Sequence, residues 1–247
     1  MDYPNLSRAP IVEAIIDFRF SPSASLDLPK LGSIHARISD TYTVKHENKE
    51  TQISFAVGPD NTTQQAVTGK IIGYRFEAPN EKYVLQATLN GFTLSKLAPY
   101  QNWEEFLAEA KKLLGIFIEV SGQQTIVRTA VRYINRIELY GPTVDFDDYL
   151  SAGPKIPAGL PQRLAEFVTR NVIYYPEINT SMVLVQALDV ANVANEIFPV
   201  ILDIDVSREE SYDLKSERQW VILSELHDLK NGAFFESLTG KTLELLK

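Results

Sequence analysis

Two long segments of the sequence alternate apolar and ionic residues, and they constrain the fold more than any other feature. The first is PIVEAIIDFRF at residues 10–20, and the second is TAVRYINRIEL at residues 129–139. Because neighbouring side chains of a β-strand point to opposite faces of a sheet, each segment predicts a strand with one buried face and one ionic face. Ionised groups on a sheet need a partner, solvent or a ligand. We therefore expect the functional residues on one face of a sheet.

The ionic positions of the two segments supply the candidate site. If the two strands are neighbours, the acidic residues of the first can meet the arginines of the second. One interpretation is an internal ion-pair network, in which exposed cross-strand pairs contribute about 0.2–1 kcal/mol each. The other is an open face that binds a protein partner or a small polar or anionic ligand. The candidate residues are Glu13, Asp17, Arg19, Arg128, Arg132, Arg136 and Glu138.

Asp203 and Asp205 are weaker candidates, for a divalent metal. They alternate in the segment ILDIDV, so both carboxylates project to the same side of a strand, and carboxylate oxygens are ligands for such ions. The same pair could instead bind the strand arginines. The chain has no cysteine, and no two of its three histidines are three or four residues apart, which disfavours a zinc site. No glycine-rich phosphate-binding motif occurs, so we expect no cofactor.

Apolar periodicity divides the chain into two halves, 1–122 and 123–247, with a similar order of elements. The first reads as strand, helix, four strands and helix, and Asn102 with Glu105 forms a capping box for its last helix. In YVLQATLNGFTLSKL, Asn90 and Gly91 predict a two-residue hairpin turn that sets Leu89 opposite Phe92. The expected helices and strands of the second half are a strand at 126–140, helical pieces at 146–150 and 162–169, strands at 182–188 and 200–206, a helix from Ser216 to Gly232, and a helix at 240–246.

This order predicts one continuous α+β unit. We expect a largely antiparallel sheet with helices packed on one face and two pseudo-repeated β-α-β(n)-α halves. Such an arrangement resembles the TATA-binding-protein-like and helix-grip folds. The duplication is inferred from element order alone, because no repeat is visible between individual residues.

The formal net charge of −8 makes nucleic acid and anionic lipid poor partners, because neutralising phosphates requires an excess of Lys and Arg. The opening segment MDYPNLSRAP has no apolar run of the kind found in signal peptides. No segment approaches the roughly 18 uncharged residues that a membrane helix needs. These observations predict a cytoplasmic protein.

Three segments resemble the signatures of a sporadically distributed prokaryotic protein family without an assigned activity. They are PIVEAIIDFRF, VRYINRIEL and the late segment LHDLKNGAFFESLTGKTLELL, so the resemblance extends over the whole chain. A patchy distribution is typical of mobile accessory genes, such as defence or toxin–antitoxin components, and the resemblance implies that context. It also implies a role, in binding or in the fold, for Glu13, Arg19, Arg132, Asn135, Arg136, His227, Asn231 and Phe234.

These observations favour a non-catalytic binding or interaction protein. The alternative is a metal-dependent phosphohydrolase or nuclease that uses the carboxylates of the sheet face.

Overall fold

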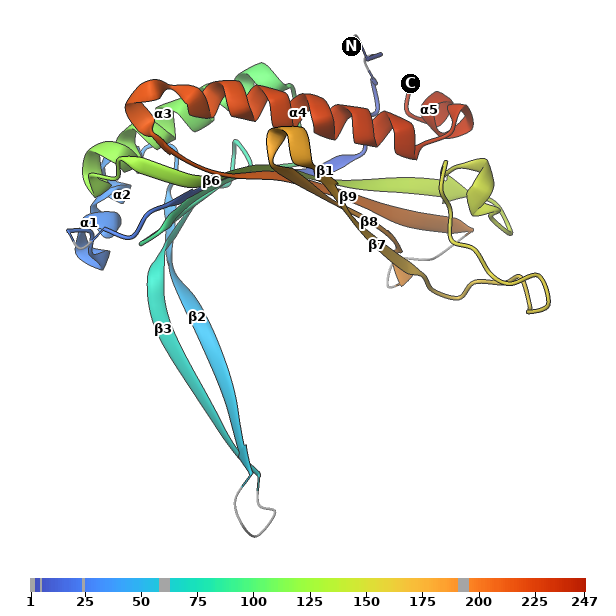
Figure 1. Cartoon of the computed structure of the whole chain (residues 1–247), viewed down its shortest axis with the longest axis horizontal. Helices are drawn as coiled ribbons and strands as arrows, with labels where there is room; N and C mark the ends of the chain where they lie inside the picture. Colours follow the sequence, from blue (N-terminus) through green and yellow to red (C-terminus); the bar gives the residue numbers. More distant parts are fainter. Residues whose placement is uncertain (1–2, 5, 24, 58–62, 191–195) are drawn as a thin grey trace.

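The part of the chain that the structure describes forms one open sheet of nine strands (Figure 1). The computed structural model describes residues 3–4, 6–23, 25–57, 63–190 and 196–247, with the backbone alone for 51–57 and 63–68. The spatial order is β2-β3-β4-β5-β1-β6-β9-β8-β7, and every neighbouring pair is antiparallel. The strands are β1 (Ile11–Phe20), β2 (Val44–Val57), β3 (Thr63–Ala78), β4 (Tyr83–Thr88), β5 (Gly91–Leu97), β6 (Thr125–Tyr140), β7 (Val168–Tyr175), β8 (Thr180–Leu188) and β9 (Ile197–Asp213).

Strands β1 and β6 lie side by side at the centre of this sheet, as their complementary ionic faces predict. Ile15 is opposite Arg132, and Arg19 is opposite Arg128. On its other side β1 pairs with β5, while β6 pairs with β9. The first strand of each half therefore bonds to the last strand of its own half and to the first strand of the other. The sheet is continuous across the boundary between the halves.

The long helices α3 and α4 lie on the same face of the sheet (Figure 1). Helix α3 begins at the predicted capping box, in which Asn102 Oδ1 accepts a hydrogen bond of 2.8 Å from the backbone N–H of Glu105. The helices are α1 (Leu28–Ser33), α2 (His35–Ile38), α3 (Trp103–Ser121), α4 (Arg218–Ser237) and α5 (Gly240–Leu245), with short 3-10 turns at η1 (Phe146–Asp148), η2 (Pro176–Ile178) and η4 (Leu214–Ser216).

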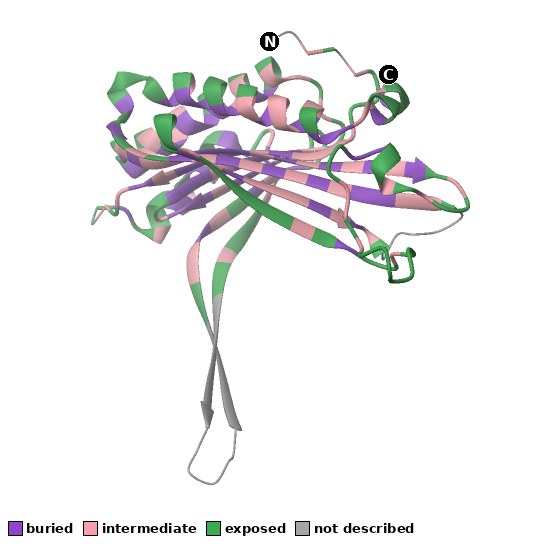
Figure 2. Ribbon diagram, turned by 45° about the vertical axis from the view of Figure 1, so that its right-hand side comes forward, coloured by how far each residue is buried: buried purple, intermediate pink, exposed green. Residues whose placement is uncertain are grey.

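The core lies between this helix layer and the sheet. Ala14, Ile16 and Phe18 of β1 are fully buried there, and so are Val131 and Tyr133 of β6. Buried and less buried residues alternate along the central strands (Figure 2). Burying a large apolar side chain contributes about 1.5–3 kcal/mol, so this alternation fixes which face of each strand meets the helices. The ionic positions are left on the opposite face.

The β4–β5 hairpin has a different register from the predicted one. Ala87, not Leu89, lies opposite Phe92, so Leu89 and Asn90 form the two-residue turn. Among the described residues the glycines with positive φ are Gly122 and Gly141, so Gly91 is not in the left-handed conformation that the prediction assumed. A Cβ at Gly91 would instead lie 2.6 Å from Arg19 Nη1. The glycine makes room for an arginine of the ionic face.

Two helix predictions in the second half are wrong. The helix expected at 162–169 is absent, and β7 begins at Val168 instead. Strand β7 was not predicted because its solvent face also carries apolar residues, namely Val168, Val172 and Tyr174. They remove the alternation of apolar and polar residues by which a strand is recognised. Gly232 does not end α4, which continues to Ser237.

Helix starts also differ from the predicted ones. Helix α4 starts at Arg218, with Glu217 rather than Ser216 as its N-cap. The helix expected after the first strand is divided into α1 and α2, with Ile34 between them. Gly32 and Ser33, which have low helix propensity, immediately precede this break.

The observed architecture is α+β, with an open and mostly antiparallel sheet, as predicted. Among the described residues, no helix combines the length and the apolarity needed to cross a membrane.

The close contact between β3 and β4 can be tested at Gly73. A Cβ at this position would lie 2.1 Å from the carbonyl oxygen of Ala87 and 2.7 Å from Thr88 Cα, and backbone atoms cannot rotate away. We expect Gly73→Ala to lower the free energy of unfolding by about 2–4 kcal/mol, measured by urea denaturation. Gly69→Ala in the same strand, with no described atom within 4 Å of the added methyl, is the control and should change it by less than about 1 kcal/mol. Equal effects would contradict this account of Gly73.

Candidate functional site

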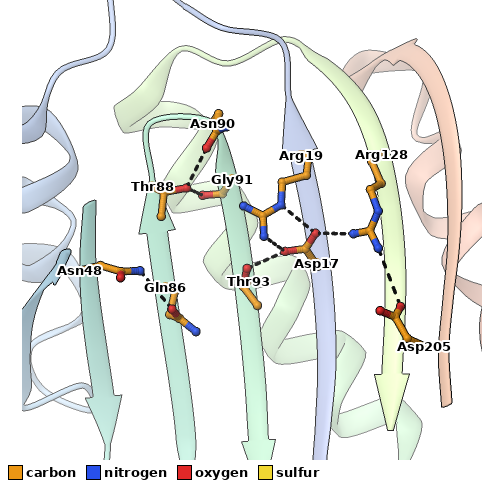
Figure 3. A network of polar contacts seen from close by, with 10 residues as sticks. All are labelled: Asp17, Arg19, Asn48, Gln86, Thr88, Asn90, Gly91, Thr93, Arg128 and Asp205. Atoms are coloured by element: carbon orange, nitrogen blue, oxygen red, sulfur yellow. Dashed lines mark hydrogen bonds and ion pairs between the residues drawn. The ribbon is translucent and has the colours of Figure 1, made fainter. Parts of the chain in front are cut away.

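The sheet face away from the helices carries a connected set of ionic side chains at its centre (Figure 3). Asp17 and Arg19 of β1 lie beside Arg128 of β6, and Arg128 reaches towards Asp205 of β9. Strand alternation places all four on this face, since their neighbours in sequence point into the core. The predicted meeting of carboxylates and arginines across the two central strands is therefore present.

Asp17 is the centre of this set, and its side chain is only 10% exposed. Oδ1 accepts hydrogen bonds from Arg128 Nη1 at 2.9 Å and Arg19 Nε at 3.1 Å. Oδ2 accepts one from Thr93 Oγ1 at 2.7 Å and lies 2.9 Å from Arg19 Nη2. Removing a carboxylate from water is costly unless its oxygens are bonded. These donors satisfy both oxygens and link β5, β1 and β6.

Arg132 binds Asp203 in a bidentate pair. Its Nε donates to Oδ1 at 2.8 Å and its Nη2 to Oδ2 at 2.5 Å. The hydrogen bonds that Arg132 donates to Asp203 raise the pKa of the Arg132 guanidinium further above its usual value, against the effect of burial. A planar guanidinium matches a carboxylate in this geometry, so the pair fixes the direction of both side chains.

Asp205 is the least satisfied carboxylate of the set. Its Oδ1 is buried, has no hydrogen-bond partner among the described residues, and lies 3.8 Å from Arg128 Nη2. Burial raises the pKa of Asp205, while the charges of Arg128 and Arg132 act in the opposite direction. Arg128 thus faces two carboxylates and is close to only one of them.

Arg136 and Glu138 belong to a separate group nearer the end of β6. Arg136 Nη1 donates to Glu138 Oε1, and Arg136 Nε lies 3.5 Å from Asp189 Oδ2. Tyr140 Oη donates to Glu138 Oε2 at 2.7 Å, and this bond and the one from Arg136 lower the pKa of Glu138. Of the seven predicted site residues, these two are therefore set apart from the other five.

The other five line a single cavity of about 390 Å³ on the open face. Sequence reasoning missed the polar contribution of β4 and β5 to this cavity, which Gln86, Thr93 and Ser95 supply. The alternation of apolar and polar residues along that hairpin was the sequence signal that could have indicated this contribution. The lining residues are Glu13, Ile15, Asp17, Arg19, Gln86, Thr93, Ser95, Arg128, Ala130, Arg132 and Asp205.

The metal candidates Asp203 and Asp205 do project from the same face of β9, but Asp203 already binds Arg132 through both oxygens. Within the described ranges, no group of three or more His, Cys, Asp or Glu side chains is arranged to hold a metal ion. A metal at Asp203 would have to displace a charge-assisted bidentate pair.

Three further residues that the resemblance singled out, His227, Asn231 and Phe234, lie on α4 on the opposite side of the sheet. His227 stacks on Trp103 at the start of α3, with ring centroids 4.2 Å apart. Next to it, Lys230 Nζ lies 3.7 Å from the ring centroid of Tyr133 and donates a hydrogen bond of 2.5 Å to Asn231 Oδ1. Lys230 was not predicted, and only its place beside Asn231 in the third signature could have indicated it.

Burial shifts the protonation equilibria of this second cluster. Desolvation lowers the pKa of Lys230 to about 7, opposed by the nearby Asp228 carboxylate. Desolvation also lowers the pKa of His227 to about 3, and the Lys230 charge adds to this effect. Tyr133, whose hydroxyl lies 2.9 Å from that of Tyr100, has a pKa raised well above its usual value by burial. The cluster is largely buried between α4, the start of α3 and β6.

A scan against protein-family models finds no match for this chain, and a search of curated proteins finds no matching sequence. The resemblance carried by the three signatures stays a prediction.

The buried amine of Lys230 gives the stability of the protein a defined pH dependence. The unfolded chain keeps this proton up to a pH of about 10.5, whereas the folded chain releases it near pH 7. Unfolding therefore takes up a proton within this window, so the stability rises with pH across it. We expect Lys230→Met to raise the free energy of unfolding at pH 7 by a few kcal/mol, and this gain should shrink by pH 9.5. Chemical denaturation at both pH values measures it. An equal gain in the free energy of unfolding at both pH values would contradict the burial of a charged amine. Lys247→Met, at the exposed end of the chain, is the control.

Proposed function

We propose that this protein is a non-catalytic binding protein, and that the cavity on its open sheet face binds a small ligand carrying charges of both signs. The observation that supports this is the lining of the cavity, which combines three guanidinium groups with three carboxylates. A cavity so balanced disfavours a ligand of one sign only, because such a ligand would meet like charges on one side. Of the partners expected from the sequence, which were a protein partner or a small polar or anionic ligand, the proposal therefore selects a small ligand that carries both charges.

Hydrogen-bonding capacity remains on both kinds of group. Arg19 and Arg132 each use Nε and Nη2 for a carboxylate, so Nη1 of each has no partner among the described residues and can donate to an acidic group. Glu13 forms no ion pair with any described residue and lines the same cavity. It can accept from an amine or another N–H group. The exposed fraction of the side chain is 43% for both arginines, so these groups are within reach of solutes.

The size of the cavity limits the ligand further. Its volume of about 390 Å³ lies near the lower end of the roughly 300–1,000 Å³ found for ligand sites. The three arginines around it are already held by ion pairs, so binding would immobilise few additional side chains. A free amino acid or a short peptide end has the charges and the size that this cavity would accept.

Arg132→Ala tests the proposal directly. Differential scanning fluorimetry with free amino acids at about 10 mM should show a rise in the unfolding midpoint of the wild type, because a ligand that binds only the folded state stabilises it. The variant should lose this rise while its own free energy of unfolding falls by only about 1 kcal/mol, as for a partly exposed ion pair. Arg170→Ala on β7, outside the cavity, should keep the response. A response retained by Arg132→Ala would remove the cavity from consideration, and a loss of several kcal/mol in stability would identify a structural network instead.

The alternative function is metal-dependent hydrolysis of phosphate esters or nucleic acid. It is favoured by the carboxylates of Asp203 and Asp205 on one face of β9 and opposed by the bidentate contact of Arg132 with Asp203.

Metal titration distinguishes the two functions. We expect Mg²⁺ and Mn²⁺ at about 5 mM to leave the unfolding midpoint unchanged, because Arg132 already neutralises Asp203. We also expect no phosphate release from nucleotides or polyphosphate. A Mg²⁺-dependent rise in the midpoint that disappears in Asp203→Asn would establish the hydrolase instead, and Asp213→Asn, at the end of β9, is the control for nonspecific effects.

We also infer that the halves 1–122 and 123–247 are related by duplication, in a saddle-like arrangement. The place of β1 beside β5, and of β6 beside β9, supports this, since in each half the first strand pairs with the last. A cytoplasmic location and a mobile accessory or defence gene cluster remain part of the proposal. A neighbouring gene for a nuclease, kinase or toxin would favour a protein partner over a small ligand.

A further inference from the structure

A second cavity lies on the helix side of the sheet, away from the ionic face. Its volume is about 780 Å³. One wall is the side of α4 between Glu225 and Ser237, and the floor is formed by the side chains of β7 and β8 that point towards the helix layer. It is a groove along α4, and 12 steps of 1.5 Å give it a length of about 18 Å.

The groove is apolar along its middle. Ile173 and Leu184 form part of the floor, and Leu229 and Ala233 project from the wall. Gly232 and Ala233 are the smallest residues of the wall, and a Cβ added to Gly232 would meet only Tyr3 Oη, at 3.2 Å. Small residues on a helix allow a second helix backbone to approach closely.

At the opposite end of the sheet, the corresponding space beside a long helix is occupied by helical segments. There, α1 packs against α3 and β3, and the segment that follows α1 continues over the same region. Leu31, Ile34 and Ile38 are buried in this packing, at a spacing typical of one face of a helix. Beside α4 no described helix takes this position, because the segment that leads from β6 to β7 contains only the short turn η1.

The rim of the groove is acidic. Glu225, Asp228 and Glu236 line it, and no lysine or arginine among the described residues does. Glu225 is held by Arg208 Nη1 at 2.6 Å, whereas Asp228 and Glu236 are exposed and form no ion pair with the described residues. A partner with positive charges beside its apolar face would complement this rim.

We propose that this groove binds a basic amphipathic helix of a partner protein. The helix would have about 12 residues, with apolar side chains at i, i+3 and i+7 in the groove and Lys or Arg towards Asp228 and Glu236. This proposal does not depend on the ionic cavity, which lies on the other face of the sheet.

Fluorescence anisotropy with designed peptides tests it. The probe is a fluorescein-labelled helical peptide of about 14 residues, with leucines on one face and lysines at its edges, and the controls are a scrambled peptide and one with glutamates in place of the lysines. We expect saturable binding of the lysine peptide alone. Ala233→Trp, which fills the middle of the groove, should weaken it at least about tenfold, while Ser224→Trp on an exposed part of α4 should leave it unchanged.

A charge exchange separates the groove from nonspecific attraction. In Asp228→Lys/Glu236→Lys, we expect the lysine peptide to lose affinity and the glutamate peptide to gain it. Glu166→Lys/Glu244→Lys, with the same change in net charge, should show neither effect. This charge exchange tests the proposal even if Ala233→Trp does not fold. Equal binding to the two charge variants would overturn the proposal, and so would the absence of saturable binding. A wild-type dimer in light scattering that Ala233→Trp converts to monomer would also overturn it, because this result would identify the occupant as a second copy of this chain.

Discussion

The antiparallel pairing of β1 with β6 is the interaction on which the rest of the structure depends. It joins the two halves of the chain into one sheet, and its register sets Arg19 opposite Arg128 and Ile15 opposite Arg132. Two facing arginines repel each other unless a carboxylate lies between them, and Asp17 provides that carboxylate. On the other face, the same register brings the fully buried Ile16 opposite Val131 beneath the helices. One alignment thus satisfies the apolar and the ionic requirements together.

The ion-pair network links three strands of the sheet whether or not a ligand is bound. Asp17 is nearly enclosed and receives hydrogen bonds from three side chains on three strands, so both of its carboxylate oxygens have partners away from water. Breaking one partner of such a set costs more than the pair contributes, so each member holds the others in position. Arg19 Nη1, which has spare hydrogen-bonding capacity, therefore belongs to a rigid set of side chains, and the bidentate pair with Asp203 holds Arg132 in place as well. Rigidity of this kind favours affinity for a ligand that fits and selects against one that does not.

Much of this fold can be predicted from the sequence, and the failures share a physical origin. The strands near Ile11 and Thr125 and the helix after Asn102 follow from strong periodicity and a capping box, which are local signals. Strand β7 was missed because its exposed face is apolar, and the hairpin register was missed because Gly91 is needed for the space that Arg19 occupies, which no local rule reveals. The charged members of the cavity were predicted because alternation places them. Lys230 was not, since apart from its place beside Asn231 in the third signature no local pattern indicates that a lysine of α4 is buried over Tyr133.

The alternation within β1 also restricts how this protein can change over evolution. Both edges of β1 are hydrogen-bonded to neighbouring strands, so the strand has no free side along which to slide. One residue inserted after Ala14 would turn Asp17 and Arg19 towards the helices and Phe18 towards solvent, reversing both faces at once. Substitutions in β1 can be accepted singly, whereas a change of length between Glu13 and Arg19 would disrupt the regular pairing with β6, whose register shifts lie only at its two ends. Variation in length is therefore expected in the connections at the ends of the strands, and the central pair should keep a constant number of residues among related sequences.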